Sequence, residues 1–146
     1  VVPHGKNLEN FVKEAPRKLT CILCKRMMYR IAERIAEIEK AEGIVTGEAI
    51  GEQASQTMHN LRVLSEAAMK YPVHRPLLGF NKTETEVLAR KIGTFEISTK
   101  KAKDCSAAPS KPSTKAKLEI VKKAEEKFNI ERMIQESLKE ARIVTV

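Results

Sequence analysis

Two cysteines three residues apart, Cys21 and Cys24, begin the part of the chain whose residue types could do chemistry. Their spacing is typical of metal ligands or of a redox pair. Two thiols do not complete a metal site, and the third cysteine, Cys105, lies far along the chain. Three thiolates without a fourth protein ligand can hold an iron–sulfur cluster, although four are usual. Zinc, a cluster and a redox pair therefore stay open, beside the simpler reading of two buried thiols and one surface thiol.

Three cations could serve the same site. Lys25 and Arg26 directly follow the cysteine pair, where they would lower the pKa of a thiolate and could meet a phosphate. Lys82 follows an extended segment and could reach the same cleft from another strand end. Each is more often an ordinary surface charge. The histidines share no ligand spacing, so we interpret them as ordinary polar residues: His4, His59 and His74.

A glycine-containing stretch, IVTGEAIGEQASQT, occupies residues 44–57. Gly47 and Gly51 stand between a predicted strand and a predicted helix, where backbone amides can face an anion or a ring. Four polar side chains follow at the predicted start of the helix, and they are Gln53, Ser55, Gln56 and Thr57. A plain strand-to-helix turn is the competing interpretation, because the stretch matches neither common phosphate-binding glycine motif.

Hydrophobic periodicity supplies the elements that must position these residues. The predicted helices run from Met27 to about Ala41, from Met58 through Ala68, and over residues 81–92, 115–128 and 130–141. The predicted strands or extended segments are residues 1–4, 43–47, 71–80 and 142–146. Residues 99–117 hold six lysines, two prolines and three serines and are predicted to be a mobile loop that carries Cys105. The five methionines follow helix faces and are predicted to be core residues.

Alternating strands and helices predict an α/β fold with three layers, a mostly parallel sheet flanked by helices. Ligands in such folds bind at the carboxyl ends of the strands, which directs attention to the loop after residues 43–47. With 146 residues and 42% hydrophobic residues, the chain can form one ordinary domain.

The net charge of +8 favours polyanionic partners, nucleic acid first among them, although a lysine-rich solvated surface explains it about as well. No apolar run is long enough for a membrane span, so we expect no membrane partner. We expect a cytoplasmic protein, because two of its three cysteines form a CxxC pair and such thiols suit a reducing compartment.

The ordered motifs closely resemble the tRNA 4-thiouridine synthetases, also called thiamine-biosynthesis sulfurtransferases. The resemblance covers nearly the whole chain and is carried by CxxCKRMMYRIA at residues 21–32, residues 44–57, RPLLGFNKTE at 75–84, ARKIGT at 89–94 and DCSAAPSKPST at 104–114. Members of this family are PP-loop ATP pyrophosphatases of the adenine-nucleotide alpha-hydrolase-like fold. They use ATP, with magnesium, to adenylate the uridine at position 8 of tRNA, and then replace the activated oxygen with sulfur.

The resemblance also implies roles for residues. Lys25, Gly47 and Gln56 match nucleotide-contacting positions, with Arg26 beside them, and Lys82 matches a lysine important for activity. Cys105 matches the cysteine that handles sulfur. Members that lack a rhodanese domain, many of them archaeal, hold an iron–sulfur cluster on three cysteines, which here would be Cys21, Cys24 and Cys105. The sulfur donor would be sulfide or the persulfide of a cysteine desulfurase, and some members also supply sulfur for the thiazole of thiamine.

The family's phosphate-binding SGGxDS loop and its THUMP domain have no counterpart in residues 1–146. We therefore expect the chain to be the C-terminal part of the PP-loop domain, inactive alone and partnered by an N-terminal half. A homodimer is a further expectation, because a half-domain leaves a sheet edge and apolar helix faces uncovered. Two alternatives stay open: a related enzyme that 2-thiolates another tRNA base, and a non-catalytic RNA-binding or zinc-stabilised module.

Overall fold

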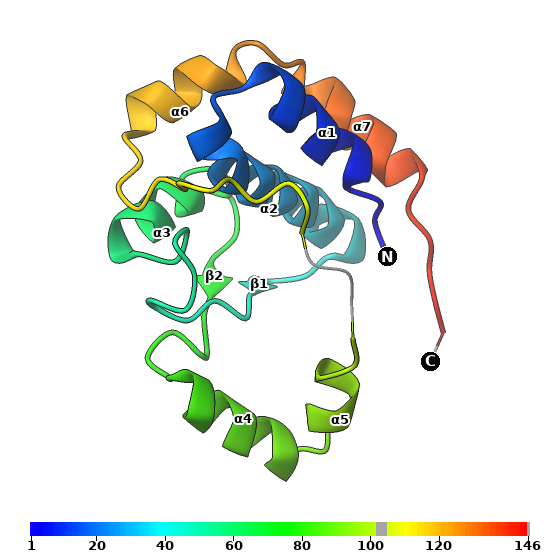
Figure 1. Ribbon diagram of the computed structural model, residues 1–146. Coiled ribbons are helices and arrows are strands. Elements are labelled where there is room, and N and C mark those ends of the chain that lie inside the picture. The colour runs from blue at the N-terminus through cyan, green and yellow to red at the C-terminus, as the bar shows by residue number, and fades with distance from the viewer. Residues whose placement is uncertain (102–104, 146) are drawn as a thin grey trace.

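The computed structural model describes residues 1–101 and 105–145. Most of its ordered backbone is helical, and a short parallel sheet lies among the helices (Figure 1). The elements in chain order are α1 (Gly5–Glu14), the 3-10 helix η1 (Arg17–Leu19), α2 (Thr20–Glu39), β1 (Ile44–Val45), α3 (Met58–Ser65), β2 (Val73–His74), α4 (Lys82–Lys91), α5 (Phe95–Ser98), α6 (Leu118–Glu125) and α7 (Ile130–Lys139).

Helix α2 is the centre of the core. It contacts α1, α3, α6, α7 and β1, and Figure 1 shows α1, α6 and α7 on the side of α2 away from the strands. Its buried Leu23, Met27 and Ile31 recur every four residues and form the stripe that the neighbouring helices cover. The helix ends at Lys40, which adopts the left-handed conformation with φ 54°, while the Ala41 amide donates to Ala36 O at 2.9 Å.

The helix begins seven residues earlier than the periodicity predicted, at Thr20 instead of Met27. The reason is that the buried Ile22 and Leu23 extend the apolar face of Met27 toward the N-terminus. The CxxC motif therefore lies on a helix and not in a loop before one. The predicted end near Ala41 agrees with the structure to within two residues.

The strands β1 and β2 pair in parallel, with Ile44 opposite Val73 and Val45 opposite His74. Gly43, directly before β1, is a close-packing position. A Cβ atom there would lie 3.1 Å from the His74 ring and 3.3 Å from Pro72 O, so a side chain at this point would require the ring to shift. The chain leaves both strands at the same edge of the sheet, which is where the sequence predicted a binding loop.

Several predicted elements are wrong at the ends of the chain. Residues 1–4 are not a strand but the lead into α1, which the sequence analysis missed. Residues 142–145 are not a strand either, and Val146 lies outside the described residues.

Three of the five methionines are not core residues, because Met28, Met58 and Met69 are 47%, 62% and 79% exposed. Met27 and Met133 are buried as predicted.

Helices α4 and α5 pack on each other below the sheet, away from α1 and α2 (Figure 1). Helix α4 begins with a capping box, in which the Asn81 side chain accepts from the Glu84 amide at 2.9 Å and Glu84 accepts from the Asn81 amide at 2.8 Å. No residue of α4 or α5 is buried in the part of the chain that the structure describes. Among the described helices, none combines the length and apolar content needed to cross a bilayer.

Candidate functional site

The first turns of α2 carry the predicted cysteine pair. Cys21 and Cys24 lie three residues apart on one face of the helix, and both are partly exposed. Arg17 and Lys25 flank them and lower the pKa of the Cys21 thiol, but burial and the charge of Cys105 outweigh this and raise that pKa above its ordinary value. Metal binding would oppose this rise, since a bound cation favours the thiolate.

The segment after residue 105 returns to the N-terminal end of α2, and its return is anchored by Asn60 of α3. The fully buried Asn60 side chain donates to Ser113 O at 2.8 Å and accepts from the Ala116 amide at 2.9 Å. The Ser113 amide in turn donates to Lys18 O, at 3.0 Å, immediately before α2. These bonds hold the lysine- and proline-rich segment against the domain at residues 113–116. Its predicted mobility is untested, and residues 102–104 lie outside the described part of the chain.

Cys105 reaches the neighbourhood of the cysteine pair. The next residues, Ser106 and Ala107, line a pocket together with residues of α1 and with Arg17. A charge on Cys105 raises the pKa of both helical thiols. Burial first, and then the charges of Cys105 and Cys21, raise the pKa of the Cys24 thiol to about 11. The Cys105 charge thus acts on both helical thiols, and the gathering of the three sulfurs into one site stays a prediction.

The described residues do not gather three His, Cys, Asp or Glu side chains tightly enough to enclose a metal ion. The donor chemistry suits a thiophilic group, because thiolates are the ligands that zinc and iron–sulfur clusters prefer, and the nearby Lys25 and Arg17 favour the charged form of Cys21. The three-cysteine ligand set stays a prediction. The sequence analysis also missed a residue here: the His4 Nε2 atom lies 3.2 Å from Cys24 Sγ. Burial lowers the pKa of His4.

Lys25 points to a polar network that the sequence analysis did not identify. Its Nζ atom lies 3.4 Å from Glu48 Oε1, and the same carboxylate accepts a hydrogen bond from Arg75 Nε at 2.8 Å and another from the Tyr29 hydroxyl. The bonds from Tyr29 and Arg75, with the Lys25 charge, overcome burial and lower the pKa of Glu48. Glu48 follows Gly47 in the predicted binding loop, so this network ties Lys25 of α2 to that loop.

Arg26, by contrast, does not fit its predicted role as a nucleotide contact. Its side chain is 1% exposed. Its nitrogens donate to Glu125 Oε1 at 2.8 Å, to Glu66 Oε2 at 2.9 Å and to Val63 O. With these nitrogens bound to protein oxygens inside the helical core, Arg26 has a structural role, and we remove it from the binding residues.

The predicted binding loop has unoccupied space beside the Gly47 backbone and one buried polar atom without a hydrogen-bond partner among the described residues. A Cβ atom added at Gly47 would meet nothing within 4 Å, so a ligand can approach that backbone closely. Gly51 takes the positive φ of 83° that its turn requires, and its amide donates to Gln56 O at 3.0 Å. Gln56 is 9% exposed, and its Oε1 atom is buried without a hydrogen-bond partner among the described residues. A buried acceptor of this kind is costly unless a bound group donates to it.

Lys82 lies at the first position of α4 and is exposed. No hydrogen bond or ion pair in the described structure links it to the other predicted site residues, Lys25, Gly47, Gln56 or Cys105. Its role therefore stays a prediction.

Comparison with known proteins connects this geometry to a family. The family described as Thiamine biosynthesis protein (ThiI) matches residues 1–130. The chain belongs to this family. This result confirms the resemblance found in the sequence. Among its relatives, a probable tRNA sulfurtransferase of Methanosarcina mazei is 43% identical over 143 residues, which are 98% of this chain and 35% of the relative. Another, of Methanothermobacter thermautotrophicus, is 42% identical over 133 residues, which are 91% of this chain and 34% of the relative.

A solved structure matches the fold of this chain. The crystal structure of a 4-thiouridine synthetase–RNA complex with bound ATP has a TM-score of 0.87 and 38% sequence identity over 97% of this chain and 37% of that chain. The α/β prediction is thereby confirmed. This chain spans about a third of the length of these relatives: 35% of the Methanosarcina mazei protein and 34% of the Methanothermobacter thermautotrophicus protein.

Proposed function

We propose that this chain forms the C-terminal part of the PP-loop domain of an ATP-dependent tRNA sulfurtransferase that makes 4-thiouridine. The observation that carries the proposal is the return of the segment after Cys105 to the N-terminal end of α2, where the Ser113 amide donates to Lys18 O, within a fold that matches a 4-thiouridine synthetase bound to RNA and ATP. In this proposal the complete enzyme includes the N-terminal half with the SGGxDS loop. That half would hold the pyrophosphate, and tRNA and a sulfur donor would be its partners.

On the nucleotide side, the proposed contacts are Lys25, Gly47 and Gln56. The unpartnered Gln56 Oε1 suits an amino-group donor such as that of adenine, and the open Gly47 backbone allows a ring or a phosphate to approach. Lys25, oriented by Glu48, would face developing negative charge on the phosphates with bound magnesium. Lys82 is proposed to act in the same cleft once the complete enzyme is assembled.

The chemistry proceeds in two displacements. In the first, O4 of the uridine attacks the α-phosphorus of ATP, a new P–O bond forms, and the bond to the β-phosphate breaks to release pyrophosphate. In the second, a sulfur nucleophile attacks C4 and the C4–O4 bond breaks, so that AMP leaves with O4. With sulfide as donor no oxidant is needed. In the alternative without a cluster, Cys105 carries a persulfide whose outer sulfur attacks C4 as AMP leaves. Cys21 then attacks the Cys105 sulfur, the S–S bond to the outer sulfur breaks to free the 4-thiouridine, and the two cysteines end as a disulfide.

Cys21, Cys24 and Cys105 would hold an iron–sulfur cluster, which when bound would supply an iron able to bind the donor sulfur. Lys25 and Arg17 would balance part of the thiolate charge. Asn60, through Ser113 and Ala116, would keep the third ligand in reach.

Deleting the complete gene that encodes this chain should remove 4-thiouridine from tRNA, because no other step forms that C4–S bond in the proposal. Mass spectrometry of digested tRNA nucleosides measures the loss. Restoring the intact gene should return the nucleoside, whereas the gene carrying Cys105→Ser should not restore it to the wild-type level.

Other outcomes of the deletion would replace the proposal. Loss of a 2-thiolated nucleoside with 4-thiouridine intact would identify a related tRNA 2-thiolation enzyme. Unchanged thionucleosides, together with tRNA binding that weakens steeply with salt and ignores ATP, would identify a non-catalytic RNA-binding module.

Anaerobic reconstitution of the chain with iron and sulfide should produce a visible charge-transfer absorption that Cys24→Ala abolishes. The reason is that Cys24 is one of the three thiolates and that two cannot retain the cluster. A colourless wild-type protein that instead retains tetrahedral zinc would contradict the cluster assignment. Ser106→Ala serves as the matched control and should keep the absorption.

A further inference from the structure

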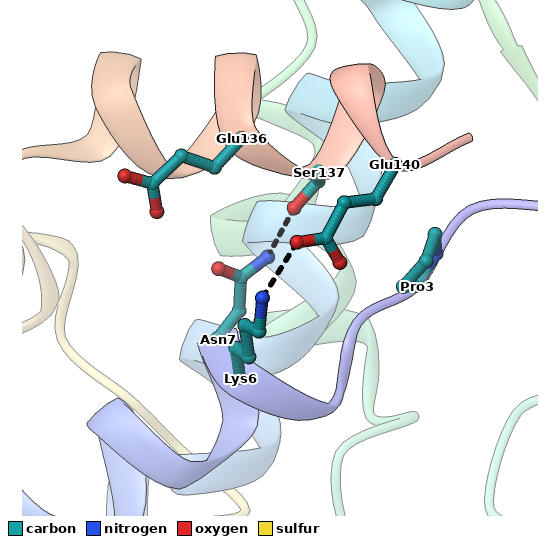
Figure 2. Close-up of a pocket in the computed structure, with 6 residues that line it drawn as sticks. All are labelled: Pro3, Lys6, Asn7, Glu136, Ser137 and Glu140. Atoms are coloured by element: carbon teal, nitrogen blue, oxygen red, sulfur yellow. Dashed lines mark hydrogen bonds and ion pairs between the residues drawn. The ribbon is translucent and has the colours of Figure 1, made fainter.

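A chain of hydrogen bonds crosses from α7 through α1 to the cysteine pair. Figure 2 shows its first part, in which the Asn7 side chain of α1 reaches Ser137 of α7 at one side of a shallow pocket. The Asn7 Nδ2 atom lies 2.8 Å from Ser137 Oγ, and both residues are buried. The Ser137 hydroxyl donates its proton to Met133 O, at 2.9 Å, so its oxygen must accept from Asn7.

This bond fixes the orientation of the Asn7 amide. Its NH2 group donates one hydrogen to Ser137, and the same nitrogen lies 3.4 Å from His4 Nδ1. An amide nitrogen can only donate, so the ring atom that it faces must be an acceptor. His4 Nδ1 then carries no proton, and in the neutral ring the proton is on Nε2.

The Nε2 atom is the one that lies 3.2 Å from Cys24 Sγ. We propose that His4 is a fixed N–H donor to the Cys24 sulfur, held in that tautomer by Asn7 and Ser137, and is not a fourth metal ligand. A ring nitrogen that bears a proton cannot bind a metal, whereas an N–H group directed at sulfur stabilises the thiolate form.

The proposal makes the two helical cysteines inequivalent. Cys24 has an N–H donor from α1, whereas in the described part of the chain no side chain is hydrogen-bonded to the Cys21 sulfur. His4 is therefore a positioning residue for the Cys24 thiolate, and it leaves any fourth coordination position free for another ligand. The consequence for sulfur transfer rests on the proposed function, but the tautomer does not.

Asn7→Asp is the sharpest test, because it replaces the amide donor by an acceptor of the same shape. In the full 146-residue chain at neutral pH, long-range 15N–1H NMR should show His4 with its proton on Nε2 in the wild type. In Asn7→Asp the proton should move to Nδ1. His59, whose Nε2 lies 2.8 Å from the carbonyl Ala116 O, is an internal reference for the Nε2–H form and should not change. A wild-type His4 with its proton on Nδ1, or on both nitrogens, would overturn the proposal.

Zn²⁺ is diamagnetic, so the same NMR spectra can show whether His4 is a hydrogen-bond donor to Cys24 or a ligand of the metal. On addition of Zn²⁺ to the wild-type chain, His4 Nε2 should keep its proton; loss of that proton with a metal-bound nitrogen shift would show a fourth ligand and overturn the proposal. In the iron-reconstituted chain, His4→Leu should lower the reduction potential, because the donor is lost, and His4→Gln, whose amide can donate, should restore part of it. Equal potentials in all three proteins would also count against it. None of these readouts depends on tRNA thiolation, so they can succeed even if the proposed function fails.

Discussion

Replacing Cys105 by serine in the complete enzyme should lower the rate of 4-thiouridine formation about a hundredfold or more, because the sulfur-handling thiol is lost. The substitution removes one sulfur atom from an exposed side chain, so it should leave the fold intact. ATP-dependent release of pyrophosphate on tRNA should persist, since the residues proposed for the first displacement lie on α2 and on the loop after β1. Single-turnover assays that follow pyrophosphate and 4-thiouridine separately would measure both steps.

Ser106→Ala is the neighbouring control and should retain full thiolation. Cys21→Ser should also reduce thiolation if that residue is a ligand or a resolving thiol. The assignment of Cys105 fails if its serine variant thiolates tRNA at the wild-type rate, or if both steps are lost together while the protein stays folded. Loss of both steps would indicate that the segment contributes to the nucleotide site instead.

The approach of Cys105 to the cysteine pair could be predicted only through the family resemblance. Spacing alone identifies Cys21 and Cys24 as a possible ligand or redox pair but says nothing about a thiol some eighty positions away. The bonds that bring the segment back depend on Asn60, a residue in the middle of a helix with no motif of its own. Long-range hydrogen bonds of this kind leave no periodic signal in a sequence.

The role of His4 could not be predicted for a similar reason. The helix α1 that carries Asn7 begins with Gly5 and has only three apolar residues, Leu8, Phe11 and Val12, and the sequence analysis overlooked this short amphipathic pattern. His4 shares no sequence spacing with the cysteines and reaches Cys24 only because α1 packs on α2. Glu48 likewise has no motif of its own in the sequence, and only the structure shows that Arg75 and Tyr29 donate hydrogen bonds to its carboxylate.

Lys25 and Arg26 show how one wrong boundary affects a site prediction. Adjacent residues on a helix point about 100° apart, so both cannot face the same cleft. With the helix assumed to begin at Met27, the two cations looked like parts of a loop with equal access to a phosphate. Because α2 in fact begins at Thr20, Lys25 reaches the binding loop while Arg26 enters the core.

Arg26→Ala should lower the free energy of unfolding of the chain by about 3–5 kcal/mol, the loss typical of a broken buried ion pair. The substitution leaves the buried Glu125 with Arg30 alone, deprives Val63 O of a donor, and opens a cavity beside α2. The Arg26 and Arg30 guanidiniums outweigh burial and lower the pKa of Glu125, so its contribution to stability is present above its unfolded pKa and is lost as the pH falls through the lower folded value. Urea unfolding followed by far-UV circular dichroism at neutral pH would measure the difference.

Lys25→Ala is the matched comparison one residue away. Its ammonium is 3.4 Å from a carboxylate that keeps Arg75 and Tyr29 as partners, so its removal should cost less than about 1 kcal/mol of stability. In the complete enzyme the same variant should weaken ATP binding, measured by calorimetry. The opposite pattern would be an Arg26→Ala protein that is as stable as the wild type but deficient in ATP binding. That result would show that Arg26 contacts the nucleotide after all. It would also show that the burial of its guanidinium between α2, α3 and α6 is not what holds these helices together.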